Sequence, residues 1–183
     1  MAHFRPSPKD QKLRMFHHLS RFNGAGGKRP PYPKRPVVLL AGLGGGIAIA
    51  ILALLGAGLG VTLLLGSFGA SCVLLFGYPE APFAQPANVI GGHLICTAIG
   101  LALLYGCGAH AWSLALAVGL SLAAMMATRT THPPAGSNPV IVFLAQPAWS
   151  FIVFPVLSGA VLLVLVALVY NNVVRKERYP TYW

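Results

Sequence analysis

From Val37 to Val174 the chain contains only two fully charged side chains, Glu80 and Arg129. Soluble domains carry a charge on roughly a quarter of their residues, whereas 9% of this chain is charged and 56% is hydrophobic. An uncharged segment of that length can be solvated by lipid but not by water. The chain is therefore predicted to be an integral protein of a lipid bilayer.

Basic residues flank this segment and give the chain a net charge of +10. Nine of the 13 Lys and Arg precede Val37, and a second group follows the last apolar run: Arg175, Lys176 and Arg178. Because Lys and Arg are retained on the cytoplasmic side of a membrane, both termini are predicted to be cytoplasmic. Basic tails can also bind nucleic acid. Topology already explains tails that flank membrane spans, so no nucleic-acid partner is predicted.

The residues before the apolar segment lack the apolar stretch and cleavage site of a secretory signal peptide. Within them, Leu13–Phe22 fits either an amphipathic helix on the anionic membrane surface or an unstructured tail. The predicted location is a bacterial inner membrane, with the chloroplast envelope as the alternative for a plant protein. The predicted domains are a basic tail and linker (1–36), a transmembrane domain (37–174) and a short basic tail (175–183).

Breaks rich in Gly, Pro and polar residues divide the apolar region into helical segments. About 20 residues cross a bilayer, so residues 37–77 hold either two spans or one span and a re-entrant piece, with the break at 56–60. A loop is expected at 78–88 and a tight turn at 106–110. The remaining predicted spans are Val89–Tyr105, Ala111–Ala127 and Ser150–Tyr170.

A weak internal repeat relates residues 66–94 to residues 132–160. Each stretch has a break of small residues, an apolar run, the triplet Ala-Gln-Pro and a long span. Two such three-segment units in sequence must be inverted relative to each other. The predicted fold is therefore an all-α polytopic membrane helix bundle, built as two inverted three-segment repeats with broken second and fifth segments. Both six crossings and four crossings with two re-entrant loops are compatible with cytoplasmic termini, and Arg129 favours six.

The stretch TRTTHPPAGSNPV, residues 128–140, interrupts the apolar region of the second half. Pro133 and Pro134 cannot continue a helix from the preceding span, and proline is well placed in the first turn of a new one. The glycines of GSFGAS, residues 66–71, are expected to play the same part in the first half. A helix that starts inside a membrane exposes unpaired N–H groups, which are tolerated beside a watery cavity and attract anions.

The predicted substrate pathway combines these helix starts with nearby hydrogen-bond donors and basic side chains. Its residues are Ser67, Gly69, Ser71, His93, Arg129, Thr131, His132, Pro133, Pro134, Gly136, Ser137 and Asn138. Two of them have simpler alternative roles: His132 as a helix cap or the partner of a carbonyl, and His93 as a helix-packing residue. With no carboxylate inside the membrane core, a cation route is disfavoured, and proton coupling would have to use a histidine: His93, His110 or His132.

The cysteines, glycine pairs and terminal aromatics have structural interpretations. Three cysteines at scattered spacing without a CxxC motif predict small buried side chains and no metal or cofactor: Cys72, Cys96 and Cys107. The pairs Gly42/Gly46 and Gly56/Gly60 are typical of close helix packing and favour a homo-oligomer. An interfacial aromatic belt is predicted from Tyr170, Tyr179, Tyr182 and Trp183.

Two long motifs resemble the HPP family of integral membrane proteins, which is named for the His-Pro-Pro at 132–134. They are GSFGASCVLLFGYPEAPFAQPANVIGGHL and TRTTHPPAGSNPV, and the resemblance covers roughly Pro36–Asn172. It implies a small polytopic membrane protein, usually described with four spans. Plant chloroplast and cyanobacterial members of the family are associated with nitrite transport, so the resemblance implies nitrite as the substrate.

These features predict a transporter or channel for a small monovalent anion, with nitrite favoured and the pathway between the two halves. One alternative is a structural or sensory membrane protein that recruits partners through its basic tail. Another is a membrane enzyme that pairs Ser137 with His132. The enzyme is disfavoured because no carboxylate is available to orient the histidine, and no catalytic residue is predicted.

Overall fold

Proline and glycine set the ends of the helices in the computed structural model, which describes residues 27–183. The first described helix begins at Arg35 and has proline in its first turn, where the missing N–H forfeits no hydrogen bond. It ends at Gly60, which adopts a left-handed φ of 66° that residues with a Cβ rarely take. Proline also lies in the first turn of the helices that begin at Pro86 and Asn138. Most of the expected breaks therefore coincide with helix ends.

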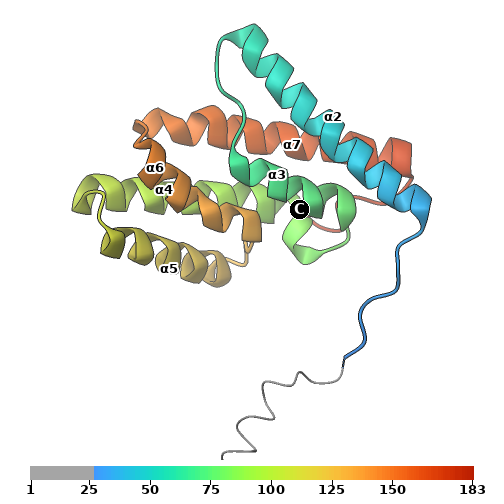
Figure 1. The fold of residues 1–183 in the computed structure, drawn as a ribbon, viewed down its shortest axis with the longest axis horizontal. Coiled ribbons are helices and arrows are strands. Elements are labelled where there is room, and N and C mark those ends of the chain that lie inside the picture. The colour runs from blue at the N-terminus through green and yellow to red at the C-terminus, as the bar shows by residue number, and fades with distance from the viewer. Residues whose placement is uncertain (1–26) are drawn as a thin grey trace, which may run out of the picture. The chain divides into compact units, whose positions relative to one another are not determined.

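The described residues are helical and contain no β-strand (Figure 1). The α-helices are α2 (Arg35–Leu59), α3 (Gly66–Cys72), α4 (Pro86–Cys107), α5 (Ala111–Ala127), α6 (Asn138–Ala145) and α7 (Ser158–Val169). Turns of 3-10 or π-helix extend or join them at Val73–Gly77, Pro82–Ala84, Pro133–Ser137, Trp149–Ile152, Val153–Leu157 and Tyr170–Arg175. In this part of the chain, the helices long and apolar enough to cross a membrane are Arg35–Leu59, Pro86–Cys107 and Trp149–Arg175. The predicted all-α membrane class is confirmed.

One end of the helix bundle holds the start of α2 and the end of α7, and we call it the terminal end. The Tyr170 hydroxyl donates to the carbonyl of Leu40 in the first turns of α2 at 2.8 Å. The amide of Asn171 donates to the Leu75 carbonyl, in the π-helical turn after α3, at 2.9 Å. The helices α2 and α7 therefore run in opposite directions (Figure 1), and α3 runs toward the terminal end.

The start of α4 and the end of α5 also lie at the terminal end. The amide of Asn88 in α4 donates to the carbonyl of Thr131, just after α5, at 3.0 Å. The hydroxyl of Tyr179, beyond α7, donates to the carbonyl of Ala84, just before α4, at 2.8 Å. Burial raises the pKa of the Tyr179 phenol, which keeps it protonated as a donor. Both α5 and α7 arrive at this end, and α4 leaves from it.

The opposite end of the bundle joins α4 to α5 and α6 to α7. There the Tyr105 hydroxyl at the end of α4 donates to the Pro147 carbonyl, after α6, at 3.0 Å. Between α2 and α3 the chain returns into the bundle without helical structure. The Leu63 carbonyl passes so close to α7 that a Cβ added to Gly159 would lie 2.7 Å from it. The helix α3 therefore begins inside the bundle and not at its end.

Within residues 34–183 the chain thus passes between the two ends six times. Each half consists of a helix, a pass with a non-helical break and a further helix, an order that is compatible with the predicted broken second and fifth segments. The broken passes are residues 60–77 and 128–145, whose helical parts are too short to cross a ~30 Å hydrocarbon core alone. The other four passes are α2, α4, α5 and the pass that contains α7, so a count of four spans and a count of six segments refer to one arrangement. Symmetry between the two halves stays a prediction.

The predicted aromatic belt is wrong for two of its four members. Tyr170 and Tyr179 are 5% and 2% exposed, and their hydroxyls anchor backbone carbonyls at the terminal end. Tyr182 and Trp183 are exposed.

The predicted amphipathic segment, Leu13–Phe22, lies outside the described residues.

The pair Gly56/Gly60 does not mediate helix packing but the reversal of the chain after α2. A Cβ added to Gly56 would lie 2.7 Å from the Val61 carbonyl, so only glycine lets the returning chain pass. Two of the cysteines, Cys72 and Cys96, are buried as predicted.

Candidate functional site

Four of the predicted pathway residues meet in a buried polar cluster inside the bundle. Ser71 lies in α3 and His93 lies in α4. His132 directly precedes the 3-10 turn Pro133–Ser137, and Asn138 is the first residue of α6. All four side chains are at most 1% exposed. Both short helical segments and one long helix therefore contribute to the cluster.

The hydroxyl of Ser71 lies between the two imidazole rings. Its Oγ is 2.7 Å from Nε2 of His132 and 3.1 Å from Nε2 of His93. The Nδ1 atom of His132 is 2.7 Å from the carbonyl of Phe83. A carbonyl can only accept, so this nitrogen carries a proton and donates it, and Nε2 of neutral His132 is an acceptor.

That assignment determines the direction of every bond in the cluster when both histidines are neutral. Ser71 donates to Nε2 of His132, so its oxygen accepts from Nε2–H of His93. Nδ1 of His93 is then an acceptor, and the amide of Asn138 donates to it at 3.0 Å. The same amide nitrogen lies 2.9 Å from the Thr97 hydroxyl. The result is one continuous hydrogen-bond chain from α6 through α4 and α3 to the Phe83 carbonyl.

Glycine in α4 allows the segment that carries His132 to approach so closely. A Cβ added to Gly92 would lie 2.9 Å from Cβ of His132 and 3.0 Å from the Thr130 carbonyl. Either distance is shorter than real side chains tolerate, so any larger residue would push the segment away from α4. The glycine next to His93 therefore permits the close approach of the two backbones.

The surroundings of the cluster are apolar and uncharged. The ring of Phe68 meets the His93 ring edge to face at a centroid distance of 5.1 Å, and the two histidine rings are also 5.1 Å apart. Among residues 27–183 no group of three or more His, Cys, Asp or Glu could hold a metal ion. The arrangement is suited to binding and passing protons or hydrogen-bonding a small polar solute.

A cavity of about 510 Å³, open at the protein surface where Pro133 and Ser137 are exposed, lies next to the cluster between the two short helical segments. It is lined by Gly66, Ser67, Ala70, Val73, Leu74, Pro133, Pro134 and Ser137. The hydroxyl of Ser67 is buried and finds no hydrogen-bond partner among the described residues. The Ser137 hydroxyl, in contrast, donates to the Pro134 carbonyl at 2.8 Å.

The start of the second short segment offers fewer free donors than the sequence predicts. Pro133 and Pro134 have no N–H, and the N–H of Ala135 donates to the His132 carbonyl at 2.9 Å. His132 makes no side-chain cap to this turn, so the alternative role as a helix cap is wrong, while its bond to a carbonyl is present. The unpartnered donor beside the cavity comes from Ser67 instead.

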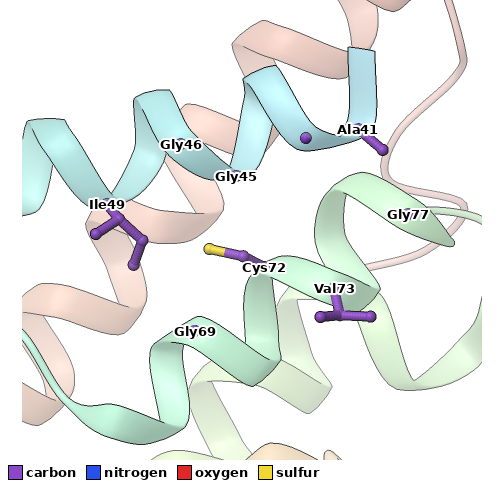
Figure 2. Close-up of a pocket in the computed structure, with 9 residues that line it drawn as sticks. Ala41, Gly45, Gly46, Ile49, Gly69, Cys72, Val73 and Gly77 are labelled. Carbon is purple, nitrogen blue, oxygen red and sulfur yellow. The ribbon is translucent and has the colours of Figure 1, made fainter. Parts of the chain in front are cut away.

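The other predicted pathway residues lie outside the cluster. Gly69 lines a separate groove of about 560 Å³ between α2 and α3, into which the thiol of Cys72 points (Figure 2). Arg129 is exposed at the terminal end. Thr131 contributes its carbonyl as the acceptor of Asn88, and Gly136 lies partly exposed in the 3-10 turn.

Three groups of the site were not predicted from the sequence. Thr97 lies one helical turn after His93, so its i, i+4 spacing on α4 could have indicated that it shares the same face. Asn88 holds the segment after α5 in place, and the Phe83 carbonyl sets the tautomer of His132. Neither of these contacts leaves a signal in the sequence, because each joins residues more than forty positions apart.

The comparison with known families identifies the family of this chain. Residues 30–180 match the model described as "HPP, transmembrane region". The chain belongs to the HPP transmembrane family.

Two curated proteins of Dictyostelium discoideum, both named only as transmembrane proteins, are similar to this HPP protein. One is 37% identical over 185 residues, covering 94% of this chain and 65% of that protein. The other is 41% identical over 128 residues, covering 66% of this chain and 41% of that protein. The chain therefore spans less than two thirds of the length of either relative. No solved structure matches it.

Proposed function

We propose that this HPP protein is a transporter or channel for a small monovalent anion, with nitrite as the first candidate. The observation that carries the proposal is the cavity between the two short helical segments, where the unpartnered Ser67 hydroxyl is buried. A buried donor without an acceptor is costly, and a bound anion would supply that acceptor. Pro133 and Pro134, which directly follow His132 in the sequence, also line this cavity.

The distribution of acidic residues supports an anion over a cation. Glu80 is the only carboxylate between Val37 and Val174, and its side chain is exposed in the loop at the terminal end. Cation carriers usually keep carboxylates within the membrane to balance the charge of the solute. Neutral donors such as Ser67 are instead suited to an anion that must be partly dehydrated.

Nitrite is favoured by the family resemblance, and the geometry by itself specifies only a small anion. We place both termini in the cytoplasm, because basic residues concentrate at Arg35 and before it and again at Arg175–Arg178. A bacterial inner membrane remains the proposed location. The glycines that line the groove between α2 and α3 make a homo-oligomer part of the proposal.

We propose no enzymatic activity for this protein. The structure pairs His132 with Ser71 and not with Ser137. A serine nucleophile needs access to a substrate, and Ser71 is 0% exposed and already shared between two histidines. The orienting partner of His132 is a neutral carbonyl, which stabilises an imidazolium less than a carboxylate does.

The proposal is tested with purified protein in liposomes and a panel of nitrite, nitrate, formate and chloride. We expect protein-dependent uptake of at least one anion, with nitrite preferred. Ser67→Ala removes the unpartnered donor, so uptake should fall by about tenfold if a hydrogen bond of ~1.5 kcal/mol to the anion is lost.

Ser121→Ala is the matched control for this experiment. Ser121 is another buried serine, in α5, and it does not line the cavity. It should therefore leave uptake unchanged. Equal uptake by both variants would remove the cavity from the pathway, and no uptake of any anion by the unmodified protein would refute the transport function.

A further inference from the structure

The hydrogen bonds of the cluster can point in either of two directions along the chain. The side-chain oxygen of Asn138 is an acceptor that the second direction requires. In the neutral state, protons point from Asn138 through His93 and Ser71 to His132 and the Phe83 carbonyl. The Oδ1 atom of Asn138 is buried and has no hydrogen-bond partner among residues 27–183. Rotation of the amide would present this acceptor to Nδ1 of His93.

We propose that the Ser71–His93–His132 cluster is a proton-binding site that moves one proton between α4 and the segment before α6. The proton site rests on the geometry of the cluster. Its use in co-transport rests in addition on the proposed anion transport. The ligand is a single proton, and the two rings are the places where its charge resides.

The transfer conserves protons at each step. A proton first binds Nδ1 of His93, which makes that ring an imidazolium. The proton on Nε2 of His93 then moves to Oγ of Ser71, while the original hydroxyl proton moves to Nε2 of His132. His132 becomes the imidazolium, and Ser71 now donates back to His93. The charge has crossed the 5.1 Å between the ring centroids, and no other bond has formed or broken.

The reversed chain keeps both imidazole rings and the Ser71 hydroxyl paired, while the rotated amide of Asn138 gives up its bond to the His93 carbonyl. His132 donates to the Phe83 carbonyl and to Ser71, and Nδ1–H of His93 donates to the rotated Asn138 oxygen. The Ser67 carbonyl, 3.2 Å from Ser71 Oγ, is a further acceptor for the hydroxyl. The Thr97 hydroxyl can donate to the same Asn138 oxygen after rotation. In both directions each ring nitrogen of the two histidines and the Ser71 hydroxyl have a partner, so the proton can move between the rings without leaving an unpaired ring N–H.

The neighbours that face the cluster are uncharged on every element packed against it. From α3 they are Phe68 and Ser71, and from α4 Thr97, with Cys96 one turn away packed on Met125 of α5. The loop before α4 contributes a carbonyl, and α6 an amide. Among residues 27–183, the only titratable group that faces either histidine across the cluster is therefore the other histidine, so a single proton is the expected occupancy.

The position of the site links the proton to the proposed anion. His132 precedes Pro133 and Pro134, which line the cavity with the unpartnered Ser67 hydroxyl. Within the described part of the chain, an imidazolium at this position would be the only positive charge beside the cavity, and it would compensate the charge of one anion. The inference is therefore electroneutral co-transport of one proton with one monovalent anion.

The first experiment observes the proton site without any transport. Solution NMR of the purified protein with ¹⁵N-labelled histidine reports which ring nitrogens are protonated. At neutral pH we expect His93 protonated on Nε2 and His132 on Nδ1. On acidification His132 should gain its second proton at the same pH at which His93 changes to the Nδ1–H tautomer. A His93 tautomer that stays constant while His132 titrates would overturn the proposed proton transfer between the two rings.

The variant Ser71→Ala tests whether the Ser71 hydroxyl carries the proton between the two rings. The variant removes the hydroxyl between the rings. The protonation of His132 and the tautomer change of His93 should then no longer occur at the same pH. Ser121→Ala, a buried serine outside the chain, should leave them coupled. If Ser71→Ala does not fold, the unmodified protein alone still decides the question through its two tautomers.

The second experiment measures protons and anions together in liposomes. A pH dye inside the vesicles should report acidification in step with nitrite or nitrate uptake, and a potential set by K⁺ and valinomycin should not change the rate. Vesicles without protein correct for leakage of nitrous acid, and nitrate avoids that leak. Ser71→Ala should lower protein-dependent proton uptake by about tenfold or more, the scale of a lost proton-transfer group.

The outcomes distinguish the two proposals. Anion uptake that depends on the potential and brings no proton overturns the co-transport and leaves the anion transporter standing. No uptake of any anion refutes the transporter and with it the co-transport, and the NMR experiment then decides on the proton site by itself.

Discussion

At the scale of single residues, the site depends on contacts between side chains that are far apart in the sequence. Ser71 and His132 are separated by 61 positions, and their side chains lie 2.7 Å apart. The sequence indicates each as a polar residue at a helix break, because breaks are encoded locally by Gly and Pro. It does not indicate the pairing, which arises only when α3, α4 and α6 pack. Ser137 is the serine nearest to His132 in the sequence, whereas the structure pairs His132 with Ser71.

Gly92 offers a test of that packing at the residue scale. Gly92→Ala would place a Cβ 2.9 Å from His132 and 3.0 Å from the Thr130 carbonyl. The segment must move, so we expect the free energy of unfolding to fall by about 1–3 kcal/mol and anion uptake to fall with it. Thermal unfolding in detergent and liposome uptake measure the two effects.

Gly119→Ala is the matched control for this variant. Gly119 lies within α5 and a Cβ there would meet nothing within 4 Å. Alanine should therefore raise helix stability by up to about 1 kcal/mol. Equal stability of the two variants would mean that the segment before α6 does not need its close contact with α4.

At the scale of elements, α5 ends by a mechanism that does not use the prolines. The N–H of Thr130 donates to the Met125 carbonyl at 2.9 Å, and the N–H of Arg129 donates to the Met126 carbonyl at 3.2 Å. This pattern is a Schellman motif, which requires a left-handed residue. Arg129 occupies that position with φ of 58°, where glycine is usual. Pro133 and Pro134 therefore shape the start of the next helical turn and do not stop α5.

Arg129→Gly tests this element and the predicted role of the arginine at once. Glycine adopts a positive φ without the steric cost that other residues bear, so the free energy of unfolding should rise by up to about 1 kcal/mol. The variant also removes a charge that the structure places on the surface, so anion uptake should persist. Thermal unfolding and liposome uptake are again the measurements.

Arg129→Ala serves as the comparison, because it removes the same charge and keeps the strained φ. It should lose the gain in stability and retain uptake. If both variants abolish uptake while the protein folds, the guanidinium is part of the anion pathway despite its exposure.

At the scale of the whole described unit, the sequence predicts where the helical segments lie better than it predicts the contacts between them. The broken passes follow from the length of the apolar runs and from the Gly and Pro breaks, which are local signals. The burial of Tyr170 depends on its bond to the Leu40 carbonyl, 130 positions away, and no local signal encodes it. Reversal of the chain between Gly60 and Leu63 likewise depends on the fit against α7. Local patterns thus predict the elements, and packing decides their contacts.

The six passes make a prediction about which loops share a side of the membrane. The hydrogen bond from Tyr179 to the Ala84 carbonyl places the loop before α4 beside the C-terminal segment. Single cysteines at Tyr78, Arg129 and Trp183, all exposed, should therefore react from the same side. Single cysteines at Ala109 and Trp149 should react from the other side. The native cysteines are first replaced by alanine.

A membrane-impermeant maleimide applied to intact bacterial cells and to inside-out vesicles makes the measurement. With the termini in the cytoplasm, intact cells should label Ala109→Cys and Trp149→Cys, and inside-out vesicles should label the other three variants. If the short segments did not cross, Ala109 would lie on the same side as Trp183, because only α2, α4, α5 and α7 would traverse the bilayer. Labelling of Ala109→Cys and Trp183→Cys from one side would thus contradict the broken passes, and the cavity between them would no longer lie on a route across the membrane.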